Sequence, residues 1–479
     1  MFKWVSLALV ATQLTAAATD GRRVCIVGAG VGGASTAHFL EGLLPSTTAN
    51  VEIVVFEQAA VEGGRVATFD HAGQTIEAGG TVFLTGNKYM MAFAERLNLS
   101  LRVPGQQLTK PSHLGIFDGD SFLFESSPTS WWNTAKLMWR YGPLSLQAFQ
   151  GSVAELVARF VRIYDLQDAG QSFVDPVELL RAVELFNLTQ YSLEEHLLQE
   201  GIGPRLINEL LAGITRVNYG QNTTMTALAG AVGLAGSGKD LRAVVGGNPQ
   251  VPRLLLRHAG ASVYFNTTVH AIEAAANGQW HVDTSTTDAS RVHTCDAVVV
   301  ATPLELTTID VPVSVPRRPF QTTHTTFVTG SLNATRFAAR AGNVPGTILT
   351  TESLRVPFSA IGLQADAGDA PPLYKVFSRT PWTDAAVAAW FVDGTAIRRY
   401  PWRAYPTYTP PETFAKFELA DGLYYVNAIE SAASAMEMSA VGGRNVALLV
   451  HKYLQTLDGK DGRRDDAVFQ DTSDGKVEL

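Results

Sequence analysis

Three glycines near the start of the chain have the spacing of a loop that binds a dinucleotide. They are Gly28, Gly30 and Gly33. Gly28 permits a tight turn, Gly30 lets the backbone approach a pyrophosphate, and Gly33 lets a helix pack closely against the preceding strand. Roughly 20 residues further on, Glu57 offers a carboxylate to the hydroxyls of a ribose. Together these residues predict a site for an adenine dinucleotide.

The segments around this loop are those that would position it. Residues 24–27 form a continuous apolar run, which is typical of a buried parallel strand. Residues 34–43 are predicted to be a helix, and residues 51–56 a second strand that ends at Glu57. The helix N-terminus would present free N–H groups and partial positive charge to the phosphates. The pattern is that of a β-α-β unit.

Three later segments favour FAD over NAD. In the segment 62–65, Gly64 would admit the flavin end of the ligand and Arg65 would offset phosphate charge. Gly80 ends a second glycine pair, and residues 298–303 form a late strand that ends in small residues. In this order and spacing, the segments resemble the flavin-containing amine oxidase superfamily.

That resemblance implies further contacts with FAD. The backbone of Val269 would contact the adenine. A helix that begins near Met436 would direct its N-terminus at the flavin pyrimidine ring and stabilise negative charge on the reduced flavin. Glu430, a few residues earlier, belongs to the same predicted cofactor site.

Longer stretches of the chain resemble the prenylcysteine oxidase family, also called prenylcysteine lyase. The resemblance extends from about residue 22 to 455 and is carried by Trp139-Arg-Tyr-Gly142, Arg216-Val-Asn-Tyr-Gly-Gln221, Ala404-Tyr-Pro406 and Glu430-Ser-Ala-Ala-Ser-Ala-Met-Glu-Met-Ser-Ala440. These motifs are much more specific than the glycine spacing.

The family cleaves the thioether of farnesyl- or geranylgeranyl-cysteine with water and oxygen, giving cysteine, a prenyl aldehyde and hydrogen peroxide. The allylic carbon can lose a hydride to the flavin because sulfur and the double bond share the positive charge. The resemblance implies an apolar slot for roughly 15 to 20 prenyl carbons, each contributing about 0.8 kcal/mol when buried. We expect this slot in the aromatic-rich middle of the chain, with Tyr219 and Tyr405 among its lining residues.

No residue is assigned as the base that activates water. The family resemblance leads us to expect a histidine soon after Gly80, but Leu84 and Thr85 stand there, and the next histidine is His113. His324 is a candidate, although a lone histidine is more often structural. The ten histidines show no spacing typical of metal ligands, so no metal site is predicted.

Two other functions compete with this interpretation. An amine or polyamine oxidase on the same fold would turn over amines and would usually have an acidic or aromatic cage for the cation. A non-catalytic carrier of prenyl lipids would be colourless because it would hold no flavin. The complete glycine loop favours a flavoenzyme over the carrier.

The predicted fold class is α/β, with a discontinuous Rossmann-like FAD-binding domain around a parallel sheet and a mixed α+β substrate domain. Residues 20–104, 241–305 and 421–457 are assigned to the FAD-binding domain. Residues 105–240 and 306–420 are assigned to the substrate domain. The residues from 458 to 479 are predicted to be a polar, frayed tail.

The chain has 479 residues, 46% of them hydrophobic and 17% charged, and its net charge is −8. This composition suits a globular protein and gives no reason to expect a nucleic-acid partner. Residues 1–18 have the pattern of a signal peptide, with Lys3 before an apolar run and small residues at the end. The exposed apolar residues expected around Trp131 and Trp132 would suit contact with a membrane surface.

The predicted secretory route has further consequences for the chain. Five sequons offer sites for glycosylation, at Asn98, Asn187, Asn222, Asn266 and Asn333. The lysosome or vacuole lumen, or export, is the expected destination. The last four residues, from Lys476 to Leu479, leave retrieval to the endoplasmic reticulum open. The two cysteines, Cys25 and Cys295, are expected to be buried free thiols, with a disulfide as the less favoured alternative.

Overall fold

The structure is a computed structural model of the whole chain. The residues it describes are 21–44, 51–109, 112–237, 240–340, 343–366 and 370–470, with side chains as far as residue 459. The predicted signal peptide and the last four residues lie outside this range. None of the helices in the described part is long and apolar enough to cross a membrane.

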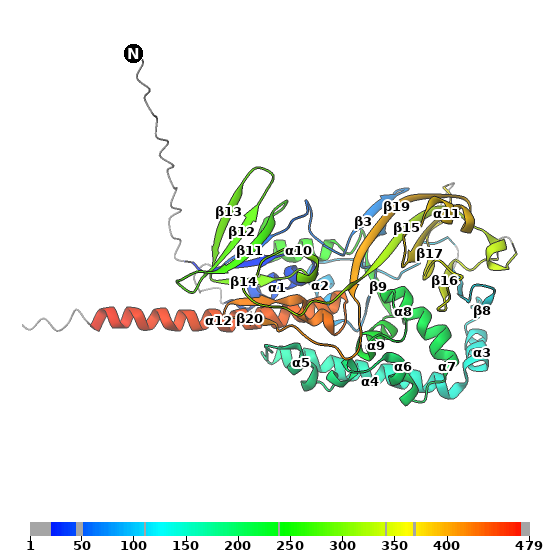
Figure 1. Cartoon of the computed structure of the whole chain (residues 1–479), viewed down its shortest axis with the longest axis horizontal. Coiled ribbons are helices and arrows are strands. Elements are labelled where there is room, and N and C mark those ends of the chain that lie inside the picture. Colours follow the sequence, from blue (N-terminus) through cyan, green and yellow to red (C-terminus); the bar gives the residue numbers. More distant parts are fainter. Residues whose placement is uncertain are drawn as a thin grey trace, which may run out of the picture.

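A six-stranded, mainly parallel sheet forms the first layer of the fold (Figure 1). Its order is β10-β2-β1-β14-β21-β20, and only the edge strand β20 runs antiparallel to its neighbour. The apolar runs of the central strands are buried on both faces, as expected for parallel strands covered by helices. The strands are β1 (Arg23–Val27), β2 (Glu52–Phe56), β10 (Ser262–Tyr264), β14 (Ala297–Val300), β20 (Glu418–Ala420) and β21 (Leu423–Tyr425).

Helices from both ends of the chain cover this sheet. Helix α1 (Val31–Leu43) packs against α12 (Met436–Gln470) and α10 (Gln250–His258), while α2 (Lys88–Arg96) contacts α10 and α12. The predicted β-α-β unit is therefore confirmed, with α1 beginning three residues before the predicted helix start.

A disulfide joins Cys25 in β1 to Cys295 at the end of β13 (Ser290–Cys295). The prediction of free thiols was wrong. Strand β14 starts two residues after Cys295 and pairs in parallel with β1, so the two Cα atoms lie only 5.9 Å apart. The strand pairing that creates this proximity is not visible in the spacing of the two cysteines.

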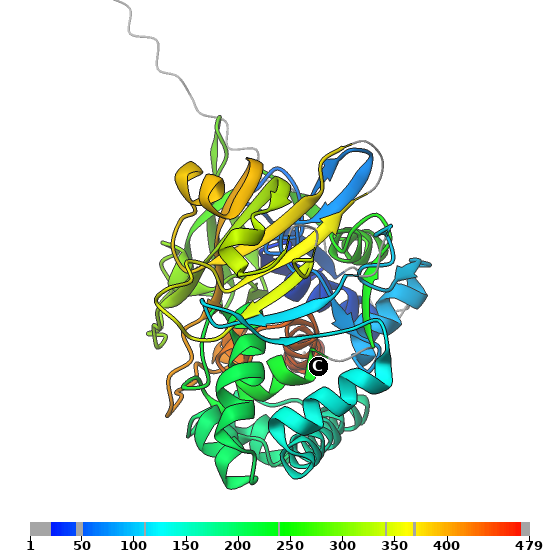
Figure 2. The ribbon, with the colours of Figure 1, turned by 90° about the vertical axis from the view of Figure 1, so that its right-hand side faces the viewer.

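A seven-stranded mixed sheet forms a second layer, next to a layer of helices (Figure 2). Its order is β19-β15-β18-β17-β16-β7-β8. The strands are β7 (Leu114–Phe117), β8 (Phe122–Glu125), β15 (Phe320–Leu332), β16 (Thr347–Thr350), β17 (Ala360–Ala365), β18 (Leu373–Ser378) and β19 (Phe391–Pro406). The helices are α3 (Ser130–Tyr141), α4 (Pro143–Asp168), α5 (Pro176–Ala182), α6 (Leu193–Gln199), α7 (Pro204–Leu206), α8 (Ala212–Tyr219) and α9 (Ala227–Ala235), with α11 (Asp384–Trp390) before β19.

Smaller sheets complete the structure. They are the hairpin β3 (Thr68–His71) and β4 (Gln74–Glu77), the antiparallel β11 (Thr268–Ala274), β12 (Trp280–Ser285) and β13, and the strands β5 (Phe83–Leu84), β9 (Leu241–Val244) and β6 (Leu101–Arg102). Strand β20 joins the six-stranded sheet although it precedes the predicted segment 421–457. The division of the chain into two domains stays a prediction.

The C-terminal part differs from the prediction in its last segment. Strand β21 ends at Tyr425, and the 3₁₀ turn η5 (Val426–Ser431) follows, held by a hydrogen bond from Asn427 to Glu430. The expected frayed tail is helical as far as Gln470, and α12 extends beyond the body of the molecule (Figure 1). A helix that is already anchored lengthens at little cost, because nucleation is the unfavourable step.

Candidate active site

The glycine loop lies between β1 and α1, and two of its three glycines are required by the protein itself. A Cβ added to Gly28, whose φ is +108°, would lie 2.9 Å from the carbonyl oxygen of Ala301. A Cβ on Gly33 would lie 2.0 Å from the carbonyl oxygen of Gly28. Gly30 is different, because the nearest atom to its added Cβ is the Gly63 oxygen at 3.8 Å. Packing against the protein does not explain a glycine there, whereas close approach of a ligand does.

The N-terminus of α1 suits an anion. Gly30 is the N-cap and offers no side chain, and the first turn of the helix contains no acidic residue. The first N–H groups of a helix carry partial positive charge and lack partners within the helix. A pyrophosphate at this point would supply both the charge and the hydrogen-bond acceptors.

Glu57 lies at the end of β2, beside this helix start. Its carboxylate is buried and accepts hydrogen bonds of 2.9 Å from the backbone N–H groups of Ala29 and Ala59. Each carboxylate oxygen keeps a second lone pair, which a ribose hydroxyl can use. The segment that leads to Val269 lies alongside, because the N–H of Thr267 donates to the Glu57 carbonyl. Val269 itself is buried in β11, at a bulge.

Arg65 contacts two other segments of the protein. One terminal nitrogen donates to the carbonyl of Ala404 at 2.9 Å, and the other forms an ion pair with Glu430. Burial alone would lower the pKa of Arg65, but Glu430 outweighs it and the pKa is raised. The guanidinium therefore ties the glycine turn at Gly63 and Gly64, both with positive φ, to η5. Its expected role in offsetting phosphate charge stays a prediction.

Glu430 lies in η5, and Met436 is the first residue of α12. Glu430 is buried and also accepts a hydrogen bond of 2.8 Å from Ser434. Met436 faces the second glycine pair, since its sulfur would lie 3.8 Å from a Cβ added to Gly80. The structure thus brings Gly80, Arg65, Glu430 and Met436 together, four of the residues predicted to hold the cofactor.

Several buried polar atoms near these residues have no hydrogen-bond partner among the described residues. They include the side-chain oxygens of Asn427 and Ser431 in η5 and of Thr323 and Thr325 in β15. An unsatisfied buried polar atom costs free energy, so such atoms usually mark a missing ligand or water. With the open cradle at Gly30 and the carboxylate of Glu57, they fit a bound FAD.

Two of the family motifs meet beside Arg65. Tyr219 is buried, and its ring lies edge-on to those of Tyr405 and Tyr408, with centroids 4.9 and 5.4 Å away. The Gln221 side chain donates to the Pro406 carbonyl at 3.0 Å and accepts from the N–H of Tyr408 at 2.9 Å. The proposed lining residues Tyr219 and Tyr405 therefore share one aromatic cluster.

This cluster contains a residue that the sequence analysis missed. Tyr408 is buried and donates its hydroxyl to the carbonyl of Glu430 at 3.2 Å. Burial raises the pKa of all three tyrosines, so the hydroxyls stay protonated at neutral pH. The short spacing between Tyr405 and Tyr408 in the sequence could have drawn attention to Tyr408.

Lys375 was also missed. This lysine of β18 is buried and donates 3.0 Å hydrogen bonds to the Glu77 carbonyl and the Thr81 hydroxyl, on either side of the second glycine pair. Burial lowers its pKa to about 8, against an opposing effect of Glu77. Burial raises the pKa of Glu77 to about 7, although Asn248 and Lys375 oppose the shift. A single lysine inside the apolar run 373–377 could have drawn attention to Lys375.

The histidine candidates do not reach this region. His324 pairs with Ser378, whereas its neighbour Thr325 pairs with Phe377 and Phe327 pairs with Lys375. Because side chains alternate along a strand, His324 points to the face opposite Lys375. This orientation gives no support to His324 as the base. His113 precedes β7, towards the far edge of the seven-stranded sheet.

A cavity of about 460 Å³ lies between the seven-stranded sheet and the helical layer. Its lining includes the carboxylates of Glu194, Glu209 and Glu352. Such a polar lining does not suit a prenyl chain, so the position of the apolar slot stays a prediction.

Comparisons with known proteins agree with this geometry. Residues 124–460 match the family described as prenylcysteine lyase, and residues 26–97 match an NAD(P)-binding Rossmann-like domain. Farnesylcysteine lyase of Arabidopsis thaliana is 39% identical, with 90% of this chain and 89% of the relative covered. Prenylcysteine oxidase 1 of Mus musculus is 34% identical, with 94% and 93% covered.

The fold also has relatives among solved structures. Cyclohexylamine oxidase from Brevibacterium oxydans superposes with a TM-score of 0.60 at 16% identity, covering 91% of this chain and all of the other. This likeness shows the flavin amine oxidase-like fold alone. The family match covers most of the chain, and the chain therefore belongs to the prenylcysteine lyase family.

Proposed function

We propose that this protein is an FAD-dependent oxidase that cleaves prenylcysteines. One prenylcysteine, one water and one dioxygen would give cysteine, a prenyl aldehyde and hydrogen peroxide. The observation that carries the proposal is the similarity to farnesylcysteine lyase over 90% of the chain. The junction of the Tyr219 and Tyr405 motifs with Arg65 and Glu430 supports it, because these motifs meet where the second glycine pair and α12 converge.

The residues of the chain would hold the cofactor and exclude water. FAD, when bound, accepts a hydride from the carbon next to sulfur and passes the electrons to oxygen. Gly30 and the start of α1 would hold its pyrophosphate, and Glu57 its ribose. The N-terminus of α12 at Met436 would favour negative charge beside the second glycine pair. The aromatic cluster would keep the thioether in an environment with little water.

An absorption spectrum and anaerobic mixing test the proposal directly. Purified protein should show bound flavin, which farnesylcysteine should bleach in the absence of oxygen. Readmitted oxygen should give one peroxide per aldehyde. Turnover of putrescine or cyclohexylamine instead would favour an amine oxidase, and a colourless protein that binds farnesylcysteine would favour a carrier.

The proposed lining residues have their own test. Tyr405→Ala should raise KM for farnesylcysteine by at least roughly tenfold, because it removes one large apolar contact worth about 1.5–3 kcal/mol. Tyr191→Ala is a matched control, since Tyr191 is half-buried and lies outside the cluster. An unchanged KM in Tyr405→Ala with a folded protein would remove Tyr405 from the substrate site.

We further propose that α3 docks on a membrane. Only Tyr141 is buried in this helix, whereas the exposed fractions are 70% for Trp131, 47% for Trp132 and 92% for Trp139. Met138 of the same helix and Leu144 in the first turn of α4 are exposed as well. The prediction that this region is exposed is thus confirmed. Tryptophan and long apolar side chains favour the interface of a bilayer, where a prenylated substrate would also accumulate.

The contact should depend on apolar insertion more than on charge. Arg140, the basic residue next to Trp139, is held by both carboxylate oxygens of Glu209. Liposome flotation should therefore fall about tenfold in Trp131→Ala/Trp139→Ala and change little with salt. Val292→Ala is the control, because Val292 is 62% exposed on β13, far from α3 along the long axis (Figure 1). Equal flotation of both variants would contradict the proposal.

We also propose a secretory route that ends in the lysosome or vacuole lumen or in export. The disulfide supports it, since disulfides persist in oxidising compartments. Asn98, Asn187 and Asn266 are exposed and suit glycans, whereas Asn222 and Asn333 are half-buried. Removal of N-glycans should increase gel mobility, and loss of that shift in a triple Asn→Gln variant of the exposed sites would locate them.

A further inference from the structure

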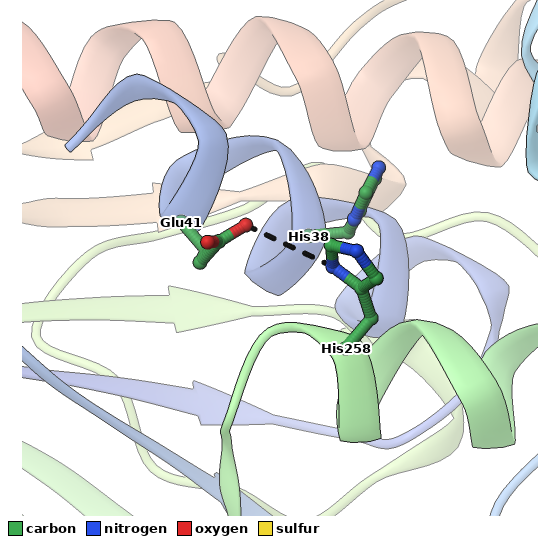
Figure 3. A group of neighbouring side chains, drawn as sticks. All are labelled: His38, Glu41 and His258. Carbon is green, nitrogen blue, oxygen red and sulfur yellow. Dashed lines mark ion pairs between the residues drawn. The ribbon is translucent and has the colours of Figure 1, made fainter. Parts of the chain in front are cut away.

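Two histidines and a glutamate lie together between the packed helices α1 and α10. His38 and Glu41 lie one turn apart on α1, and His258 is the last residue of α10 (Figure 3). One ligand atom from each residue lies within 4.8 Å of the other two. None of the three belongs to the proposed cofactor or substrate site.

Polar atoms of this cluster lack hydrogen-bond partners among the described residues. His38 is only 8% exposed, and its Nδ1 has no partner. One carboxylate oxygen of Glu41 is buried and also lacks a hydrogen bond, although it faces Nδ1 of His258 at 3.9 Å. An imidazole nitrogen and a carboxylate oxygen left unsatisfied at one point are costly, and a shared cation would satisfy both.

We propose that His38, Glu41 and His258 bind a divalent zinc ion that joins α1 to α10. Two imidazoles and one carboxylate are a frequent ligand set for zinc, with water in the fourth position. The ligand atoms must close to roughly 3.3 Å from one another, as zinc–nitrogen bonds of about 2.0–2.1 Å require. Glu41 and His258 are partly exposed and can rotate towards the buried His38, and the ion can enter from their side.

The surrounding charges set the strength of this site. Burial, followed by Arg96, His258 and Arg444, lowers the pKa of His38 to about 4, so its ring is neutral at pH 7 and can act as a ligand. The same arginines oppose a cation, and we therefore expect a Kd that is roughly micromolar. Arg96 also donates to Nε2 of His258 at 3.3 Å. When zinc takes Nδ1, Nε2 must carry the proton, and Arg96 must turn away.

Equilibrium dialysis of the FAD-loaded protein against zinc chloride tests the site. We expect one zinc per chain and a rise in melting temperature with zinc concentration. Glu41→Gln and His258→Gln should each weaken binding at least tenfold without loss of flavin. Both positions are partly exposed, which avoids the folding risk of replacing the buried His38. His270→Gln on the exposed face of β11 is the matched control and should bind zinc normally.

Arg96→Gln gives an independent result of opposite sign. Because it removes both the positive charge and the competing hydrogen bond, it should tighten zinc binding by about 3- to 10-fold. Cobalt in place of zinc should give visible ligand-field bands that disappear in Glu41→Gln. Absence of saturable zinc binding, or equal affinity in wild type, Glu41→Gln and His258→Gln, would overturn the proposal. Neither result depends on the reaction at the flavin.

Discussion

Replacing Gly33 by alanine should destabilise the protein and weaken its binding of FAD. The new Cβ would lie 2.0 Å from the carbonyl oxygen of Gly28, about 1 Å closer than side chains tolerate. Both groups belong to the backbone, so no rotamer change relieves the contact. Helix α1 must move by about 1 Å away from β1, which should destabilise the fold by about 3 kcal/mol.

The same movement should weaken FAD binding. A shift of about 1 Å misaligns the N–H groups at the helix start, and loss of one charge-assisted hydrogen bond costs about 1.5–3 kcal/mol. We therefore expect at least a tenfold loss of affinity. Purified Gly33→Ala should have a reduced ratio of flavin to protein absorbance, and added FAD should restore it only at high concentration.

Gly42 is the matched control on the same helix. A Cβ there meets nothing within 4 Å. Gly42→Ala should keep its flavin, and its free energy of unfolding should rise by about 0.5–1 kcal/mol, since alanine is the better helix former. Thermal melting and flavin content of both variants decide the matter. If Gly33→Ala keeps wild-type stability and flavin content, the close packing of α1 on β1 does not hold the phosphate loop.

Three further predictions concern buried groups. Replacing Cys25 and Cys295 by alanine should lower the free energy of unfolding, measured with denaturant, by about 3–5 kcal/mol, because the disulfide closes a very long loop. Two free thiols titrated in the unreduced wild type would contradict the disulfide. Glu430→Gln should lower the free energy of unfolding by about 3 kcal/mol, because it leaves the Arg65 charge unpaired. Asp120→Asn breaks an exposed ion pair and should lower it by under about 1 kcal/mol. Similar losses in the two variants would contradict the prediction that the Arg65–Glu430 pair matters more. The pKa of Glu77 is raised from 4.5 to about 7, so the folded state binds the extra proton and stability should fall by about 3 kcal/mol as pH rises from 4.5 to 7. Glu77→Gln should remove that part of the slope in urea titrations at several pH values, and an unchanged slope would assign it to other groups.

The glycine loop could be predicted from the sequence because its physics is local. A strand, three glycines and a helix lie within 20 consecutive residues, and each glycine has a separate geometric reason. The order of elements around it also follows from apolar runs, since buried parallel strands have continuous apolar sequences.

The positions of side chains that are set by strand register, or by segments far apart in the sequence, could not be predicted in the same way. The alternation along β15 decides that His324 faces away from Lys375, and no local pattern shows which face is which. The disulfide and the cluster around His38 depend on segments brought together only by the fold. The ion pair of Arg65 with Glu430 could not be predicted either, because Glu430 lies far away in the sequence.

The order of strands in the parallel sheet also bears on how the protein is made. Strand β1 emerges early during synthesis, but its neighbour β14 is made after more than half of the chain, and β21 and α12 follow near the end. The FAD site therefore cannot be complete in any N-terminal fragment. Loading of the cofactor must await nearly full-length synthesis, and until then β1 exposes an apolar edge that chaperones of the folding compartment would need to protect.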